Sequence, residues 1–127
     1  MRTGFKQWGL KMQDDITDGV LWLIDQGITD KDRIGIFRWS WGGYAALAGM
    51  TFTPELYCCG VDLWGITNYF TLHKSFPSYW KPFLEQINER WGDPVADKKQ
   101  MYATSPVFHV KKSRPRFLLL NQLMIRG

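Results

Sequence analysis

The sequence predicts an α/β fold in which three parallel strands alternate with helices. Three short apolar runs, at residues 33–37, 58–64 and 116–120, have the length and composition of buried strands. Segments with helical spacing of their apolar side chains separate them. Because parallel sheets are usually covered on both faces, we expect flanking helices on both sides of this sheet. The 127 residues, 45% of them hydrophobic, are enough for one domain with a packed core.

The first element is a predicted helix that begins at Asp14 and Asp15 and ends at Gly27. A short carboxylate at the start of a helix accepts hydrogen bonds from the unsatisfied N–H groups of the first turn. Glycine is common just after the last helical residue. The spacing of four apolar side chains places them on one helical face, at Ile16, Val20, Leu23 and Ile24.

Three further helices are predicted downstream. Residues 42–52, which follow the first strand, are rich in small helix-forming residues, and residues 82–92 form an amphipathic helix that ends at Gly92. Residues 95–106 add a shorter helix, and residues 67–76 have no regular pattern. The chain contains no repeats and no linker, so we expect one domain.

Composition excludes several classes of function. The last 30 residues, 98–127, carry seven basic and no acidic side chains, but "HVKKSRPRF" lacks the interleaved aromatic residues of a nucleic-acid site, so we interpret it as a solvated loop. Cys58 and Cys59 are adjacent and have no ligand-spaced partners, so we expect buried, reduced cysteines and no zinc site. No apolar run is long enough to span a membrane and no signal peptide is visible, which predicts a cytoplasmic protein with no membrane partner.

The central motif is "IGIFRWSWGGYAALAGM", residues 34–50, where a strand, a serine and a helix follow one another. A sharp strand-to-helix turn pushes its middle side chain out over the edge of the sheet. It also leaves that side chain at a helix N-terminus, where unsatisfied N–H groups favour an oxyanion. This is the geometry of the nucleophile elbow, G-x-S-x-G, whose tightness requires small residues two places before and after the serine.

The motif is incomplete at one of its two small positions. Gly42 fills the second position, with Gly43 behind it, but Arg38 stands at the first. We expect the arginine either to reach solvent or to force the turn open, because burying an unpaired guanidinium is costly. On this local pattern alone, a helix N-cap and a catalytic nucleophile are equally good interpretations of Ser40.

The longer run "QDDITDGVLWLIDQGITDKDRIGIFRWSWGGYAALAG" resembles the catalytic domain of the prolyl oligopeptidase family of serine peptidases. The resemblance continues through "TPELYCCGVDLWGITNYF", "WGDPVADKKQMYATSPVFHV" and "RPRFLLL", in the family's order. It implies a partial α/β-hydrolase fold. It also implies proteolysis of a peptide substrate by acyl transfer, with no metal and no cofactor.

By this resemblance Ser40 is the nucleophile, the backbone N–H of Trp41 is an oxyanion-hole donor, and Gly42 and Gly43 complete the elbow.

Trp39, Trp41 and Tyr44 would line the site, although packing in the core explains these aromatic residues equally well. An esterase or lipase on the same fold would use the same chemistry, but the W-G-D-P and S-P segments favour the peptidase branch.

The sequence departs from the family beyond the third strand, where "NQLMIRG" stands in place of a G-x-x-D segment and no Asp or Glu follows Asp97. Neither His73 nor His109 stands where the family's base is found. We therefore expect residues 1–127 to be the central part of a peptidase catalytic domain, without an N-terminal β-propeller or the C-terminal Asp/His segment. The alternative to an active peptidase is a truncated, inactive member that binds peptides or self-associates through open sheet edges.

Overall fold

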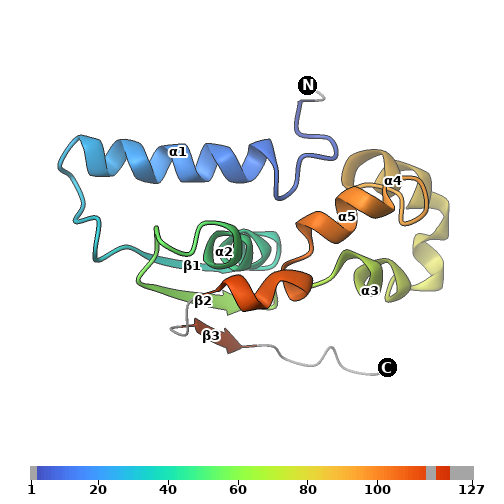
Figure 1. Cartoon of the computed structure of the whole chain (residues 1–127). Coiled ribbons are helices and arrows are strands. Elements are labelled where there is room, and N and C mark those ends of the chain that lie inside the picture. The colour runs from blue at the N-terminus through green and yellow to red at the C-terminus, as the bar shows by residue number, and fades with distance from the viewer. Residues whose placement is uncertain (1–2, 114–116, 121–127) are drawn as a thin grey trace.

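The computed structural model describes residues 3–113 and 117–120. Helices and strands alternate through the first half of the chain, and helices predominate in the second (Figure 1). In chain order the elements are α1 (Lys11–Asp25), β1 (Gly35–Trp39), α2 (Trp41–Phe52), β2 (Cys59–Leu63), α3 (Tyr69–Lys74), the 3-10 helix η1 (Ser78–Phe83), α4 (Leu84–Trp91), α5 (Lys98–Thr104), the 3-10 helix η2 (Pro106–Lys112) and β3 (Phe117–Leu120).

The three strands form one parallel sheet in the order β1-β2-β3. Arg38 on β1 is in register with Asp62 on β2, and Leu63 on β2 is in register with Leu120 on β3. The predicted α/β class, with three parallel strands and flanking helices, is therefore confirmed. Each predicted strand exists, with boundaries that differ by one or two residues.

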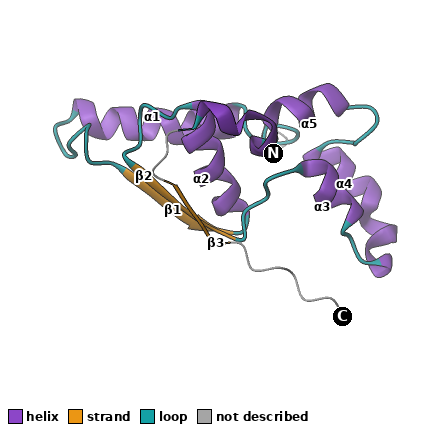
Figure 2. Ribbon diagram, turned by 60° about the horizontal axis from the view of Figure 1, so that its bottom comes forward, coloured by secondary structure: helices purple, strands orange, loops and turns teal. Residues whose placement is uncertain are grey.

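The expectation of helices on both faces is wrong for the described part of the chain. Helix α2 packs on β1 and β2, and α1 packs on α2 on the same side of the sheet (Figure 2). The opposite face carries Phe37 and Trp39, each 55% exposed. The physical reason is the handedness of the connections between parallel strands, which is right-handed. Because the strand order is β1-β2-β3, each strand adds on the same side of the one before it, and right-handed connections then lie on the same face of the sheet.

Helix α2 is the centre of the core because small side chains along it allow close packing. Ala45, Ala46 and Ala48 are buried, as is Tyr44 near its start. Tyr44 and Ala48 contact Tyr69 of α3 and Met101 of α5, which attaches the helices of the second half to the sheet layer. Trp8, in the loop before α1, packs against this cluster.

Two helices differ from their predictions. Helix α1 begins at Lys11, and Asp14 lies inside its first turn because the carbonyl of Leu10 already accepts the N–H groups of Gln13 and Asp14. Residues 67–76, expected to be irregular, contain α3, which is nucleated by Asn68: its side chain accepts the Phe70 N–H at 2.9 Å. The predicted helix ends at Gly27 and Gly92 are confirmed, and both glycines have positive φ.

The cysteines also differ from expectation. Cys58 is half-buried and Cys59 is exposed, with their sulfur atoms 3.9 Å apart and no disulfide between them. Their exposure follows from their position at the start of β2, where the strand enters the sheet. No helix among the described residues is long and apolar enough to cross a membrane.

Candidate active site

Ser40 is the single residue between the end of β1 and the start of α2. Its backbone has φ 56° and ψ −127°, a conformation that residues with a side chain rarely adopt. Two hydrogen bonds hold it there: the Ser40 N–H donates to the carbonyl of Leu63 at 3.0 Å, and the Tyr44 N–H donates to the carbonyl of Ser40 at 3.1 Å. Strain of this kind is concentrated at functional sites.

The side chain of Ser40 does not cap the helix that it precedes. No hydrogen bond joins it to the first turn of α2, and the residue is exposed. Ser40 therefore stands at the N-cap position, and its backbone carbonyl accepts the first hydrogen bond of the helix. The expected hydrogen bond from the helix to its side chain is absent, so the interpretation of the side chain as a cap is wrong. The hydroxyl is left at the N-terminus of α2, and the Trp41 N–H beside it has no intrahelical acceptor. An anion that forms there is favoured by the helix dipole.

Arg38 reaches solvent, which was one of the two outcomes expected for it. Its aliphatic stem lies along Gly42, where an added Cβ would stand 2.9 Å from Arg38 Cβ and 3.1 Å from Cγ. The residue as a whole is exposed, so the guanidinium needs no buried partner. The absence of a side chain at Gly42 is what lets a long residue occupy the position two before the serine.

Gly43 lies against β2 and the turn that follows it. A Cβ on Gly43 would contact a carboxylate oxygen of Asp62 and would lie 2.9 Å from the Cα of Gly65. Asp62 is fully buried on the face of the sheet that α2 covers. Asp62 was not among the predicted site residues, although an acidic residue inside an otherwise apolar strand stands out in the sequence.

The three aromatic residues near Ser40 divide between surface and core. Trp39 is more than half exposed, and Trp41 is half-buried with its indole N–H unsatisfied. Tyr44 is fully buried, and its hydroxyl donates to the carbonyl of Thr104 at 2.9 Å. Burial raises the pKa of Tyr44 to about 12, so its hydroxyl stays protonated. Core packing thus explains Tyr44, whereas Trp39 and Trp41 are placed where they can line a site.

Neither histidine is placed to act as the base. His73 lies on α3 beside Phe76, where burial lowers its pKa despite the opposing charge of Asp93. His109 lies on η2, with its ring 3.2 Å from the carbonyl of Tyr102. No side chain in the described ranges hydrogen-bonds to the hydroxyl of Ser40. The segment "NQLMIRG", which stands where the family's aspartate was expected, lies outside the described residues.

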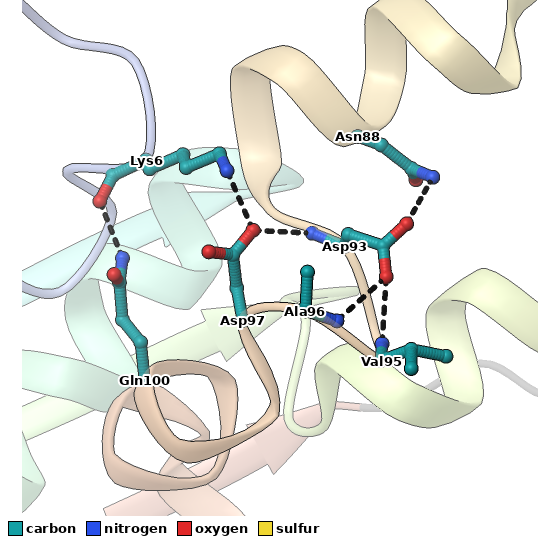
Figure 3. A network of polar contacts seen from close by, with 7 residues as sticks. All are labelled: Lys6, Asn88, Asp93, Val95, Ala96, Asp97 and Gln100. Atoms are coloured by element: carbon teal, nitrogen blue, oxygen red, sulfur yellow. Dashed lines mark hydrogen bonds and ion pairs between the residues drawn. The ribbon is translucent and has the colours of Figure 1, made fainter.

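The W-G-D-P segment forms a polar junction between the loop before α1 and the helices α4 and α5 (Figure 3). Asp93 accepts the N–H groups of Val95 and Ala96 and a hydrogen bond from Asn88. Asp97 accepts the Asp93 N–H at 2.8 Å and pairs with Lys6 at 2.7 Å. These bonds hold the pKa values of Asp93 and Asp97 below their usual range.

The junction also holds the loop before α1 in place. Gln100 on α5 donates to the carbonyl of Lys6, and the Lys6 N–H donates to the carbonyl of Arg90 on α4. Its hydrogen bonds and its ion pair join the loop before α1 to α4 and α5, so we assign it a structural role. Within the described ranges, no group of three or more His, Cys, Asp or Glu side chains could hold a metal ion.

The chain is similar to known proteins over nearly its whole length. A sequence model described as the prolyl oligopeptidase family matches residues 1–123. Dipeptidyl aminopeptidase BIII of Pseudoxanthomonas mexicana is 42% identical over 118 residues, which are 91% of this chain and 17% of that protein. The chain therefore spans less than a fifth of the length of this curated relative.

Solved structures support the fold. A puromycin hydrolase superposes with a TM-score of 0.80 at 19% identity, over 93% of this chain and 17% of that one. An acylaminoacyl peptidase in complex with Z-Gly-Gly-Phe-chloromethyl ketone superposes with a TM-score of 0.76 at 26% identity, over 91% of this chain and 18% of that one. The small parallel sheet with its helices is thus part of an α/β-hydrolase fold. From the match over residues 1–123, we conclude that this chain belongs to the prolyl oligopeptidase family.

Proposed function

We propose that the chain carries the nucleophile of a serine-type peptidase and that Ser40 is that nucleophile. The observation that carries the proposal is the backbone of Ser40: φ 56° at the single-residue turn between β1 and α2, in an exposed residue whose hydroxyl does not cap the helix. Family membership supplies the reaction class, which is hydrolysis of a peptide bond. The relatives' names, dipeptidyl aminopeptidase and acylaminoacyl peptidase, support a peptide substrate.

The reaction would proceed by acyl transfer. The hydroxyl oxygen of Ser40 attacks the carbonyl carbon of the substrate, and its proton passes to a general base. The tetrahedral oxyanion is stabilised by the Trp41 N–H and the positive end of α2. The C–N bond then breaks, the amine leaves with a proton, and water hydrolyses the acyl-enzyme to release the acid. Gly42 and Gly43 serve this step by letting the turn be sharp.

A second candidate is a family member that binds peptides without cleaving them. It is favoured by one observation: within the described residues, no histidine or carboxylate contacts the Ser40 hydroxyl. A serine hydroxyl with no base to take its proton is a weak nucleophile. The two candidate functions share the same fold and differ in whether the Ser40 hydroxyl is reactive.

Labelling with a fluorophosphonate probe distinguishes these two functions, because the probe reacts with activated serines. The wild-type chain is compared with Ser40→Ala, and Ser75→Ala, at an exposed serine that follows α3, is the matched control. Labelling that is lost only in Ser40→Ala supports the nucleophile. A chain that circular dichroism shows to be folded, and that takes no label, supports the non-catalytic function.

A further inference from the structure

The turn that follows β2 is built against the turn that follows β1. The carbonyl of Leu63, the last residue of β2, accepts the Ser40 N–H. The next residue, Trp64, has φ 57°, nearly the same as the 56° of Ser40. Two residues with side chains therefore hold positive φ at the ends of neighbouring strands. Such conformations persist only where their surroundings impose them, and the hydrogen bond from the Ser40 N–H to the Leu63 carbonyl is one contact that joins the two turns.

The contact between these turns is made by two glycines. A Cβ on Gly65 would lie 2.5 Å from the carbonyl carbon of Gly43, and a Cβ on Gly43 would lie 3.0 Å from the Gly65 nitrogen. Either added carbon would also contact Oδ1 of Asp62. The carboxyl group of Asp62 thus fills the space between the first turn of α2 and the turn after β2.

Asp62 is enclosed and receives little polar support. The residue is 0% exposed, and neither carboxylate oxygen has a hydrogen bond of normal geometry with any described residue. Burial raises the pKa of Asp62, and the nearby Gly65 N–H opposes that effect only in part. A buried carboxyl group without a partner is far cheaper to hold protonated than charged.

Nearby charges do not change this conclusion. Arg38 on β1 is the register partner of Asp62, but it is exposed and forms no ion pair with it. The other titratable groups on the packed elements are Tyr44 on α2, whose hydroxyl bonds to Thr104, and Cys59 at the far end of β2. The sequence of β3 contains no titratable side chain.

We propose that Asp62 is a positioning residue for the Ser40 site. Its carboxyl group, in the protonated form, packs between the first turn of α2 and the turn after β2 and holds them together, a contact that we call the Asp62 lock. The catalytic meaning of this lock rests on the proposed function of Ser40, but the lock itself does not. Through it, Asp62 fixes the direction of the Trp41 N–H and of the Ser40 hydroxyl without touching substrate. Asparagine, which is neutral at every pH and similar in shape, should substitute for it; alanine should not.

The test compares Asp62→Asn and Asp62→Ala with the wild type, and Asp18→Ala, at an exposed position on α1, is the control. Hydrogen–deuterium exchange is measured for residues 40–46 and 62–67. We expect Asp62→Asn to keep the protection of both segments and Asp62→Ala to lose about tenfold or more in both. Wild-type protection in Asp62→Ala, or loss of protection in a folded Asp62→Asn, would overturn the proposal.

A second measurement uses pH. Because the folded-state pKa of Asp62 is raised, its contribution to the free energy of unfolding is complete below the ordinary value of 3.8 and is lost as pH rises through the folded-state value. The stability of Asp62→Asn relative to the wild type should therefore increase as pH rises from about 4 to about 7. A difference that is constant with pH would count against a protonated lock.

Fluorophosphonate labelling of the same variants links the lock to Ser40. If the wild type is labelled, Asp62→Ala should react about tenfold or more slowly, whereas Asp62→Asn should react at least as fast as the wild type and with a flatter pH profile. Equal rates in all three variants would contradict a positioning role. If no variant is labelled, the proposed function of Ser40 fails, and the exchange and pH measurements still decide whether the lock exists.

Discussion

The stem of Arg38 and the missing side chain of Gly42 occupy the same space, since a Cβ at Gly42 would stand 2.9 Å from Arg38 Cβ. The elbow pattern G-x-S-x-G has glycine at both of these positions, and here one glycine accommodates an arginine at the other. The guanidinium leaves toward solvent, and the backbone at Ser40 keeps its sharp turn.

A double-mutant cycle measures this contact. Gly42→Ala should lower the free energy of unfolding by about 2 kcal/mol, because the added methyl meets Arg38 Cβ and Cγ. In an Arg38→Gly background the clash is gone, and the same change should be neutral or stabilising by up to about 1 kcal/mol, since alanine favours helix. Urea unfolding of the four proteins gives the coupling energy. An equal cost in both backgrounds would show that Arg38 is not what excludes a side chain at Gly42.

Backbone strain at Ser40 is tested by comparing two variants that both lack the hydroxyl. Ser40→Gly should be more stable than Ser40→Ala by about 1 kcal/mol, because glycine adopts φ 56° and ψ −127° without a Cβ clash. At Ser75, where φ is −87°, the order should reverse. Thermal unfolding of the four variants provides the comparison. A Ser40→Gly variant no more stable than Ser40→Ala would mean that the turn stores no strain.

Much of the fold could be predicted from the sequence, because strong local signals coincide with the real elements. The three apolar runs became β1, β2 and β3, and Gly27 and Gly92 end their helices as predicted. Helix α3 was missed because it is a single short helix fixed by one cap, Asn68, with no apolar period to reveal it. The exposure of Phe37 and Trp39 was missed because strand order, which local patterns do not encode, decides which face the helices cover.

The candidate site could be predicted only where local sequence determines it. The position of Ser40 between strand and helix follows from its neighbours, and the structure places it there. Asp62 stands out as an acidic residue in an apolar strand, but its proposed role could not be predicted, because that role depends on the contact of Gly43 with Gly65, two residues brought together only by the sheet. The catalytic role of Ser40 stays a prediction.

The polar junction at Asp97 predicts a stability loss at low pH. The Asp93 N–H and Lys6 depress the pKa of Asp97, so its contribution is present above the ordinary value of 3.8 and is lost as pH falls through the folded-state value. Asp97→Asn should be less stable than the wild type by about 1 kcal/mol near neutral pH, and the difference should shrink as pH falls below the ordinary value of 3.8. Asp18→Asn, at an exposed site, is the control. A difference that persists in acid would assign the effect to packing.

The loop before α1 should contribute to stability through Trp8. Its ring lies 4.9 Å from that of Trp91 and 5.8 Å from that of Trp41, so it joins the second half of the chain to the start of α2. Trp8→Ala should cost about 3 kcal/mol of unfolding free energy. Trp22→Ala removes the same side chain from an exposed site on α1, 57% exposed, and should cost less than about 1 kcal/mol. Similar losses in both variants would show that Trp8 is not part of the core.

We propose, finally, that a preparation of these 127 residues self-associates through its sheet. In the described part of the chain β1 and β3 are the outer strands, and each presents backbone N–H and C=O groups along one side. Beside the β1 edge, Phe37 and Trp39 expose apolar surface on the uncovered face, with their rings 6.4 Å apart. A second copy that pairs along β1 would satisfy the backbone groups and cover both rings at once.

Sedimentation velocity over a range of concentrations tests this association. Phe37→Lys places a charge on the uncovered face next to the edge, where it should shift the chain toward monomer, because lysine at an edge strand disfavours pairing with another strand. Trp22→Lys, at an equally exposed site on α1, should leave the association unchanged. If both variants reduced association equally, general surface hydrophobicity would be its cause. If the wild type stays monomeric at every concentration, the proposed association through the sheet edge is wrong.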